Sequence, residues 1–362
     1  MTDKSNKISK YQIVKNAIMK SIISEELLVD SVVPSENDIA KTFNVSIVTA
    51  RKALTDLVHD GFVYRIRGKG SFVKNTAQTN KSNSNMKIIS FLVMSDKEAD
   101  SSTMRLIRGA QTYLSTRGYS LVVECSNDSA EMERVLIDSC IKQNVAGIII
   151  FPVDPEMNID CYENLTNERV PFVLVDRAPE NFLVNYVSSY NLDGAYRITQ
   201  YLLSLNHKKI AFAAMNGKVE SERLRYEGYS AALKRAGIKL ENDLYINDAI
   251  DNIDKILSLV LQKEATAIIC VNDISASMII NHLRKNNIKI PQDVSITGFD
   301  DAEIAKHLSP SLTTVRQPFL EIGSAAAKQL IDCIENPFIG LGRILLSTEI
   351  IIRDSVQTAS ID

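Results

Sequence analysis

The chain has 362 residues, 45% hydrophobic and 23% charged, the composition of a globular protein long enough for two or three domains. It contains no run of about 18 apolar residues and no signal-peptide core after Met1, so we expect a cytoplasmic protein without membrane contact. The net charge of -3 divides into +4 for residues 1–75 and -7 for the remainder, which places the basic excess in the N-terminal region.

The cysteine, histidine and glycine patterns argue against a metal centre and against catalysis. The five cysteines are an odd number without close pairing, so we expect free, reduced thiols. The four histidines have no cysteine or carboxylate at ligand spacing, and we predict no metal site and no cofactor. Gly68-Lys69-Gly70 lacks the glycine spacing and the following helix of a phosphate-binding loop, and we predict no catalytic residues.

Residues 1–75 are predicted to form a winged helix-turn-helix domain. A first helix is indicated by apolar residues at helical spacing, namely Tyr11, Val14, Ile18 and Ile22. Ser35, with Asp38 three residues later, resembles a capping box and starts a second helix that ends near Phe43. Ser46 starts a third helix that ends near Gly61. Two short helices separated by a few residues are typical of a helix-turn-helix.

A basic hairpin is predicted after the third helix. The alternation of residue types over 62–67 indicates a half-buried strand with Phe62, Tyr64 and Ile66 on one face. The glycines of residues 68–70 supply a tight turn into a second strand. We interpret this hairpin as the wing that accompanies the helices on DNA.

A change of composition marks the domain boundary. Residues 75–85 consist of Asn, Ser, Thr, Gln, Lys and one Ala, which cannot bury enough apolar surface to fold, so we predict a flexible linker over residues 76–86. An effector-binding and dimerisation domain is then expected over residues 87–362.

This second domain is predicted to be α/β. Helical segments such as residues 103–117 and 192–204 alternate with apolar runs at residues 88–93, 121–123, 146–151, 170–175, 210–213, 267–271 and 294–297. Continuous apolar strands divided by helices predict parallel sheets covered on both faces. Nearly 280 residues are too many for one ordinary sheet, so we predict two lobes, with ligand in the crevice at the carboxyl ends of the strands.

These motifs support two family resemblances. Residues from about 10 to 74 resemble the winged-helix domain of the GntR family, through residues 34–36, 45–54 and 68–73. Residues from about 87 to 356 resemble the effector domain of the LacI family, which is similar to periplasmic sugar-binding proteins. The matching segments there are Gly118-Tyr119, Asp176-Arg177, residues 207–212, residues 225–229, Asn272-Asp273, residues 291–296, residues 298–301 and residues 312–315. The fusion of the two resembles the bacterial arabinose repressors.

The candidate DNA-binding residues lie on the third helix, the wing and the start of the second helix. An Arg fork such as that of Arg51 can pair with guanine in the major groove, and the other basic residues are expected at phosphates or in the minor groove. The full predicted set is Ser35, Glu36, Ser46, Thr49, Arg51, Lys52, Arg65, Arg67, Gly68 and Lys69. Ile47 stands where the GntR family usually has Arg, so the operator sequence is not carried over from the resemblance.

Four residues match positions that hold effector in the LacI family, namely Asp176, Arg225, Asn272 and Asp300. Carboxylates accept hydrogen bonds from hydroxyl pairs, an Arg fork donates two, and Asn does one of each, a set that suits a polyhydroxylated ligand. Each residue alone could equally be a helix cap or a strand-end hydrogen bond. Together, after four different strands, they favour a ligand cleft. The polar loop 95–103 lacks the aromatic usual in the family, which leaves the first-lobe contacts open.

We therefore predict a ligand-responsive repressor of carbohydrate-utilisation genes. It is expected to bind double-stranded operator DNA as a homodimer and to leave it when a small sugar such as a pentose binds. A phosphorylated sugar or a purine stays open as the ligand. The alternative from a different class is a sugar solute-binding protein, which the winged helix and the missing signal peptide disfavour. An α/β sugar-modifying enzyme is the third interpretation.

Overall fold

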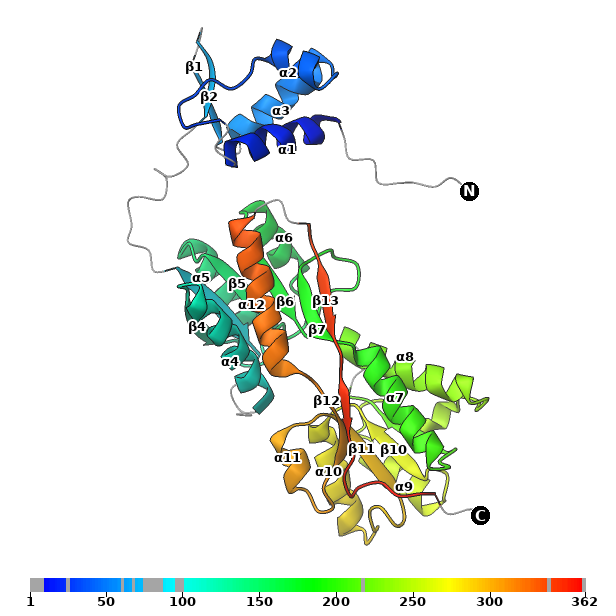
Figure 1. The fold of residues 1–362 in the computed structure, drawn as a ribbon. Coiled ribbons are helices and arrows are strands. Elements are labelled where there is room, and N and C mark those ends of the chain that lie inside the picture. Colours follow the sequence, from blue (N-terminus) through cyan, green and yellow to red (C-terminus); the bar gives the residue numbers. More distant parts are fainter. Residues whose placement is uncertain are drawn as a thin grey trace. The chain divides into compact units, whose positions relative to one another are not determined.

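The computed structural model describes residues 10–23, 27–59, 62–66, 69–73, 87–94, 101–215, 219–336 and 340–359. Contacts between residues divide the chain into two units, residues 1–85 and residues 86–362 (Figure 1). The predicted linker over residues 76–86 lies outside the described residues. Among the described residues, no helix combines the length and the apolar character needed to cross a bilayer.

The N-terminal unit consists of three helices and a hairpin, as predicted. Its elements are α1 (Lys10–Ile23), α2 (Glu36–Thr42), α3 (Ile47–His59), β1 (Val63–Ile66) and β2 (Gly70–Val73). Its core joins the apolar faces of all three helices to the base of the hairpin, through residues that include Val14, Ile39, Ala50, Leu54, Leu57, Val63 and Val73. This packing explains how a unit of this size fixes α3 relative to α2 and the wing.

Serine caps position the two helices of the helix-turn-helix. The backbone N–H of Asp38 donates to Oγ of Ser35 at 3.2 Å, and the Asp38 carboxylate accepts in return, which completes the predicted capping box of α2. The N–H of Thr49 donates to Oγ of Ser46 at 3.1 Å at the start of α3. The starts of both helices are therefore determined locally.

The wing is an antiparallel pair in which Val63 faces Val73 and Ile66 faces Gly70. Val63, which lies on the opposite face of β1 from Tyr64 and Ile66, is only 1% exposed, whereas Ile66 is 39% exposed. Val63 belongs to the core that the helices form at the base of the hairpin. Gly70 has φ +117°, a conformation that glycine adopts without strain.

The second unit contains two lobes, each built on a six-stranded sheet, as predicted. Lobe 1 has the strand order β13-β7-β6-β5-β3-β4, with parallel pairing throughout. Its strands are β3 (Ile88–Val93), β4 (Ser120–Cys125), β5 (Gly147–Ile150), β6 (Phe172–Val175), β7 (Tyr186–Ser189) and β13 (Arg343–Leu346). Its helices are α4 (Ser101–Thr116), α5 (Ala130–Lys142), α6 (Ile159–Asn167) and α12 (Phe319–Glu335), of which α12 lies across β5, β6 and β7 (Figure 1).

Lobe 2 has the strand order β14-β12-β11-β10-β8-β9. Its strands are β8 (Ile210–Ala213), β9 (Tyr245–Ile246), β10 (Ala267–Cys270), β11 (Ser295–Asp300), β12 (Thr313–Arg316) and β14 (Glu349–Ile351), with β14 antiparallel to β12. Its helices are α7 (Asn191–Ser204), α8 (Glu220–Arg235), α9 (Ile253–Leu261), α10 (Asp273–Lys285) and α11 (Glu303–His307), with a short 3-10 turn η1 (Asn242–Leu244).

The chain crosses between the lobes three times. It passes from β7 to α7 at Tyr190, returns from β12 to α12 at Gln317 and Pro318, and passes from β13 to β14 at residues 347–348. All three crossings follow the carboxyl ends of strands that pair in parallel, where α/β sheets gather ligand groups. β7, β12, β13 and β14 are strands that the sequence did not predict.

Candidate DNA-binding and effector sites

The start of α3 presents the predicted DNA-binding residues to solvent. Ser46, Arg51 and Lys52 are exposed and Thr49 is half-buried. The Ser46 and Thr49 hydroxyls lie 2.8 Å apart, so both belong to the cap of α3 as well as to its outer surface. The Lys52 ammonium lies 4.2 Å from the ring centroid of Tyr11. This cation–π contact directs the Lys52 side chain towards α1.

Glu36 connects the recognition helix to the wing. Its Oε2 accepts a 2.9 Å hydrogen bond from Nε of Arg51, and its Oε1 lies 3.4 Å from NH2 of Arg65. One carboxylate on α2 therefore orients two guanidinium groups, one on α3 and one on β1. Both Arg side chains remain largely exposed, so these ion pairs add little to the stability of the domain. Their main effect is to orient the two guanidinium groups.

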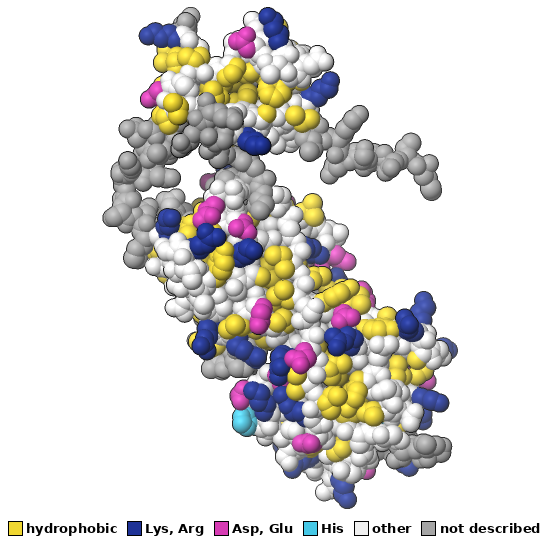
Figure 2. Space-filling model, in the orientation of Figure 1, with side chains coloured by type: hydrophobic (Ala, Val, Ile, Leu, Met, Phe, Trp, Pro, Cys, Tyr) yellow, Lys and Arg dark blue, Asp and Glu magenta, His cyan; other side chains and the backbone are white. Residues whose placement is uncertain are grey.

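The remaining predicted DNA-binding residues have separate positions. Ser35 is exposed and serves as the cap of α2. Lys69 is exposed in the turn of the wing, where its backbone N–H donates to the carbonyl of Ile66 at 3.0 Å. Arg67 and Gly68 lie outside the described residues. In the view of Figure 2, hydrophobic side chains gather on the visible face of this unit with Lys and Arg side chains around them.

Arg225 is the centre of the predicted effector set. It is buried on α8, where its Nε donates to Oδ1 of Asn191 at 2.9 Å and its NH1 donates to the carbonyl of Val271 at 2.6 Å. Its NH2 lies 3.7 Å from Oδ1 of Asp300, and its guanidinium carbon lies 3.9 Å from the centroid of the Phe299 ring. These contacts fix the guanidinium in one orientation.

Asp300 lies at the carboxyl end of β11 in a strained conformation. Its φ is +116°, which residues other than glycine rarely adopt, and such strain concentrates at functional positions. Nε2 of Gln317, on the crossing from lobe 2 to lobe 1, donates to its Oδ1 at 2.6 Å. The Asp300 carboxylate thus joins Arg225 to one of the inter-lobe crossings.

The carboxylates next to Asp300 have structural partners. Asp301 accepts hydrogen bonds from Arg353 and Arg316; burial alone would raise its pKa, but these two guanidinium groups hold the pKa below its usual value. Asp273 accepts from the Ala302 N–H at 2.7 Å, and burial, with the nearby charge of Asp300, raises the pKa of Asp273 well above its usual value.

Asn272 has the local role that the sequence left open. Its Oδ1 accepts a 2.8 Å hydrogen bond from the Ser275 N–H, so it is the N-cap of α10. The residue before it, Val271, accepts a hydrogen bond from Arg225 through its backbone carbonyl. The cap uses the carbonyl oxygen of the Asn272 amide and not its NH2 group.

Asp176 belongs to lobe 1, at the carboxyl end of β6, with φ +65°. The Tyr186 hydroxyl donates to its backbone carbonyl at 2.9 Å. Its side chain is buried, and Oδ1 has no hydrogen-bond partner among the described residues. The same holds within the described residues for Oε2 of Glu220 and Oε1 of Gln317. Within the described residues, these three oxygens and Oε1 of Gln329 are the buried carboxylate and amide oxygens without a donor.

Electrostatic influence, a shared helix and polar contacts relate these acceptors to one another. Burial, followed by the charges of Glu220 and Asp176, raises the pKa of Tyr186 far above its usual value, so both carboxylates act on one phenol. Glu220 begins α8, the helix that carries Arg225, and Arg225 leads through Asp300 to Gln317.

Polar contacts between described residues join the lobes directly, including the following three. NH2 of Arg105 on α4 donates to the carbonyl of Asp301 at 3.1 Å. Arg343 on β13 pairs with Glu220 at 3.3 Å. Arg223 on α8 pairs with Glu180, which follows β6, at 3.5 Å. These contacts are specific to the present arrangement of the lobes, so any change in their relative position must break or replace them.

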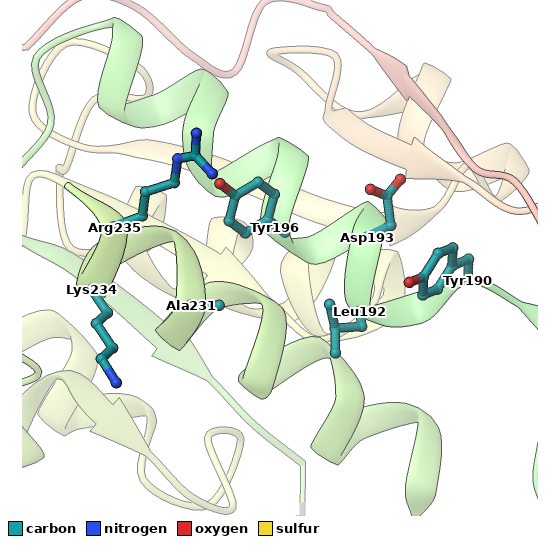
Figure 3. A pocket seen from close by; sticks show the side chains of 7 residues that line it. All are labelled: Tyr190, Leu192, Asp193, Tyr196, Ala231, Lys234 and Arg235. Atoms are coloured by element: carbon teal, nitrogen blue, oxygen red, sulfur yellow. The ribbon is translucent and has the colours of Figure 1, made fainter.

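Two open pockets lie away from the predicted effector residues. One, of about 540 Å³, lies between α7 and α8, and Figure 3 shows Arg235 extending towards Tyr196 while Lys234 points away. The other, of about 360 Å³, is lined by residues near the C-terminal segment, including His207 and Gln357. Asp176, Arg225, Asn272 and Asp300 line neither of them.

The structure thus brings Arg225 and Asp300 together in lobe 2, places Asn272 next to the Val271 carbonyl that binds Arg225, and places Asp176 in lobe 1. Sequence reasoning missed the groups that orient Arg225 and Asp300, namely Asn191, Phe299 and Gln317, and the neighbouring carboxylates of Glu220 and Asp273. Phe299 and Asp273 stand in the motifs Gly298-Phe299-Asp300-Asp301 and Asn272-Asp273, where adjacency to a predicted residue was the available signal. The partners of Arg225 and Asp300 on the crossings are remote in sequence and gave none.

Comparison with known proteins agrees with this two-part organisation. Residues 10–73 match the bacterial regulatory proteins of the gntR family, and residues 199–356 match the periplasmic binding protein-like domain. The chain is 28% identical to the arabinose metabolism transcriptional repressor of Geobacillus stearothermophilus, over 98% of this chain and 99% of that protein. It is also 28% identical to the repressor of the same name from Halalkalibacterium halodurans, over 90% of each chain.

A solved structure supports the assignment of the second unit. A LacI family transcriptional regulator from Enterococcus faecium with bound ribose has a TM-score of 0.66 and 26% identity, over 76% of this chain and 100% of that one. The match covers the whole of that regulator's chain and 76% of this one. The chain is therefore a DNA-binding transcriptional regulator that joins a gntR-type winged helix-turn-helix domain to a LacI-type, periplasmic-binding-protein-like sensor domain.

Proposed function

We propose that this regulator is a repressor of carbohydrate-utilisation genes whose sensor binds a neutral sugar, such as a pentose, between its two lobes. The observation that carries this proposal is the set of buried acceptor oxygens on Asp176, Glu220 and Gln317 without donors among the described residues. A sugar hydroxyl donates a hydrogen bond to each such oxygen. A phosphate would bring negative charge towards Asp176 and Glu220, which disfavours sugar phosphates.

Arg225 and Asp300 bind the ligand from lobe 2 in this proposal, the Asn272 amide assists, and Asp176 approaches from lobe 1. The bonds of Arg225 to Asn191 and to the Val271 carbonyl hold its guanidinium ready, so less rotamer freedom is lost on binding. The ribose complex of the Enterococcus faecium regulator supports a monosaccharide as the kind of ligand.

Ligand and DNA binding are linked through the arrangement of the lobes. A sugar that contacts both lobes favours one relative position of them and shifts the population towards it. The cross-lobe pairs Arg343–Glu220 and Arg223–Glu180 respond to that shift because each has one member on either lobe. Paired winged helices are then held at a spacing that suits the operator poorly, and the repressor leaves DNA.

On the DNA side, Arg51 reads guanine in the major groove, and Lys52, Arg65, Arg67 and Lys69 meet phosphates or the minor groove. Ser46 and Thr49 line the groove-facing end of α3. Ser35 and Glu36 shape the surface around them, and Gly68 is proposed to belong to the same DNA-binding set. A helix-turn-helix reads a short half-site, so two copies of the chain bind a near-palindromic operator in the cytoplasm.

The second copy is proposed to bind at lobe 1. β4 is an edge strand of the sheet, and its Val122 and Val123 are 42% and 43% exposed. Exposed apolar side chains on an edge strand invite pairing with another chain. Exposed Met132 and Val135 on the following helix, α5, extend the apolar surface. A symmetric dimer would cover this surface in both copies.

The test begins with a thermal-shift screen of the full chain against pentoses, hexoses, their phosphates and purines. For the sugar that stabilises the protein, calorimetry compares Arg225→Ala and Asp300→Asn with the parent. Each variant should lose about tenfold to hundredfold in affinity, which corresponds to about 1.5–3 kcal/mol for a buried charged partner.

Lys234→Ala, at the pocket between α7 and α8, is the matched control and should bind sugar like the parent. Arg225→Ala should still hold operator DNA in a mobility-shift assay but no longer release it with sugar. Loss of binding in Lys234→Ala with full binding in Arg225→Ala and Asp300→Asn would move the ligand away from the lobe crevice.

A further inference from the structure

The first turn of α3 exposes two apolar side chains to solvent. Ile47 is 47% exposed and Val48 is 72% exposed. The apolar stripe by which α3 packs against the rest of the unit is a different one, and its members Ala50, Ala53 and Leu54 are buried. Ile47 and Val48 therefore contribute little to the core of the N-terminal unit.

Neither residue is explained by helix formation. β-branched side chains lose χ1 freedom in a helix and are weaker helix formers than Ala, Glu or Lys. The cap of α3 is supplied by Ser46 and Thr49, which flank the pair in the sequence. Two adjacent β-branched aliphatic residues at this end of α3 thus remain without a structural role in the isolated domain.

The surroundings of the pair are those of a DNA-reading surface. Arg51 follows Val48 by three residues, so the two lie on the same side of the helix about one turn apart. Glu36 holds Arg51 at 2.9 Å and also contacts Arg65 of the wing, so a basic group lies one turn from Val48 and a second shares its carboxylate partner. An aliphatic side chain can neither bind a phosphate nor hydrogen-bond to a base edge.

The major groove offers one apolar group, the C5-methyl group of thymine. We propose that Ile47 and Val48 contact thymine methyl groups next to the base read by Arg51, and that they determine a preference for thymine in each half-site. This inference rests on the DNA-binding role proposed above. It assigns the sequence preference to side chains that carry no hydrogen-bonding group.

The experiment uses the full chain and duplexes that it selects from a randomised DNA library. Each thymine of a selected duplex is replaced in turn by uracil, which removes the C5-methyl group and leaves pairing unchanged. The parent protein should lose about fourfold in affinity per methyl group at one or two positions in each half-site, the value of one buried methyl-sized group.

The double variant Ile47→Ala, Val48→Ala should bind thymine and uracil duplexes equally at those positions, because it has removed the aliphatic partners. Leu261→Ala, which truncates an exposed aliphatic residue of α9 in the sensor, is the matched control and should retain the fourfold difference. Arg51→Ala should weaken binding to both duplexes while keeping their ratio.

Three outcomes would overturn the inference. Equal affinity of the parent for thymine and uracil duplexes at every position removes the methyl contact. An undiminished thymine preference in the double variant assigns the methyl contact to other residues. A parent protein that retains no duplex from the library contradicts the DNA-binding proposal itself, and the first two outcomes leave that proposal standing.

Discussion

Glu36 and Arg51 form a 2.9 Å hydrogen bond between the first residue of α2 and the exposed face of α3. The same carboxylate contacts Arg65 in the wing, so an acidic group stands inside a surface proposed to bind phosphates. Its negative charge opposes DNA binding in general, whereas its geometry directs Arg51. Glu36 therefore weakens the electrostatic attraction of this surface to phosphates and, in return, orients the Arg51 and Arg65 guanidinium groups.

This relationship predicts opposite effects of Glu36→Ala on two kinds of DNA. Affinity for random duplex should rise, because a negative charge is removed from the binding surface. Affinity for the selected operator should fall about threefold to tenfold, because Arg51 and Arg65 lose their common partner. Mobility shifts with both duplexes measure the ratio, and Glu36→Gln, which keeps the shape without the charge, serves as the control. A parallel change for both duplexes would contradict the orienting role.

Lys69 provides a test of purely electrostatic binding. It is exposed at the turn of the wing, and a phosphate contact there carries no base information. Lys69→Ala should weaken binding to all sequences alike and lower the slope of log affinity against log salt by about 0.9. Titrations at several salt concentrations measure this slope. Lys255→Ala in the sensor should leave it unchanged, and an equal effect of both substitutions would argue for nonspecific charge.

The edge strand β4 predicts the site of self-association. Val122→Lys together with Val123→Lys should shift the full chain from dimer to monomer, because two charges cannot be buried at a symmetric contact without partners. Light scattering measures the mass, and Leu261→Lys, which adds a charge at an exposed aliphatic residue of α9 in lobe 2, is the control and should keep the dimer. A double-lysine variant that stays dimeric with unchanged operator affinity would place the dimer contact elsewhere.

His207 predicts how the stability of the sensor depends on pH. Burial lowers the pKa of His207 below 6.5, although the hydrogen bond with the Gln357 carbonyl opposes the shift. As the pH falls below about 6.5, the unfolded chain binds a proton that the native imidazole does not, so the free energy of unfolding decreases. The slope from this group is at most about 1.4 kcal/mol per pH unit.

Urea unfolding at several pH values between about 5 and 7.5 measures this effect. The variant His207→Gln should show a shallower dependence than the parent over the same window, even though it loses some stability. Identical slopes for the two proteins would show that other groups account for the acid sensitivity.

Local signals made the helices predictable from the sequence. Ser35 with Asp38 and Ser46 with Thr49 contain both members of their caps within three residues, so α2 and α3 begin where the pattern indicates. The central strands were predictable because they are apolar on both faces. β7 and β12 were missed because their residues, such as Ser188, Ser189 and Thr313, are polar in sequence and are buried by the surrounding lobes.

The residues of the effector site also divide into those that the sequence predicted and those that it did not. Arg225 and Asp300, which the family resemblance proposed as effector residues, lie 3.7 Å apart. Asn191 and Gln317 complete their geometry from two different crossings between the lobes. Which crossing segment lies beside Arg225 depends on the path of the whole chain, and a single sequence does not encode that path in any local pattern.

The last part of the chain contributes to both lobes within a few residues. β13 adds an edge strand to lobe 1 and β14 adds one to lobe 2, so this segment runs along the two sheets in succession (Figure 1). Ser355, just beyond β14, also accepts from the Thr313 N–H at 2.8 Å. A premature stop codon after residue 340 would therefore damage two sheets at once and leave the DNA-binding unit untouched. Such an allele is expected to encode a winged helix that still recognises DNA without any sensor to release it.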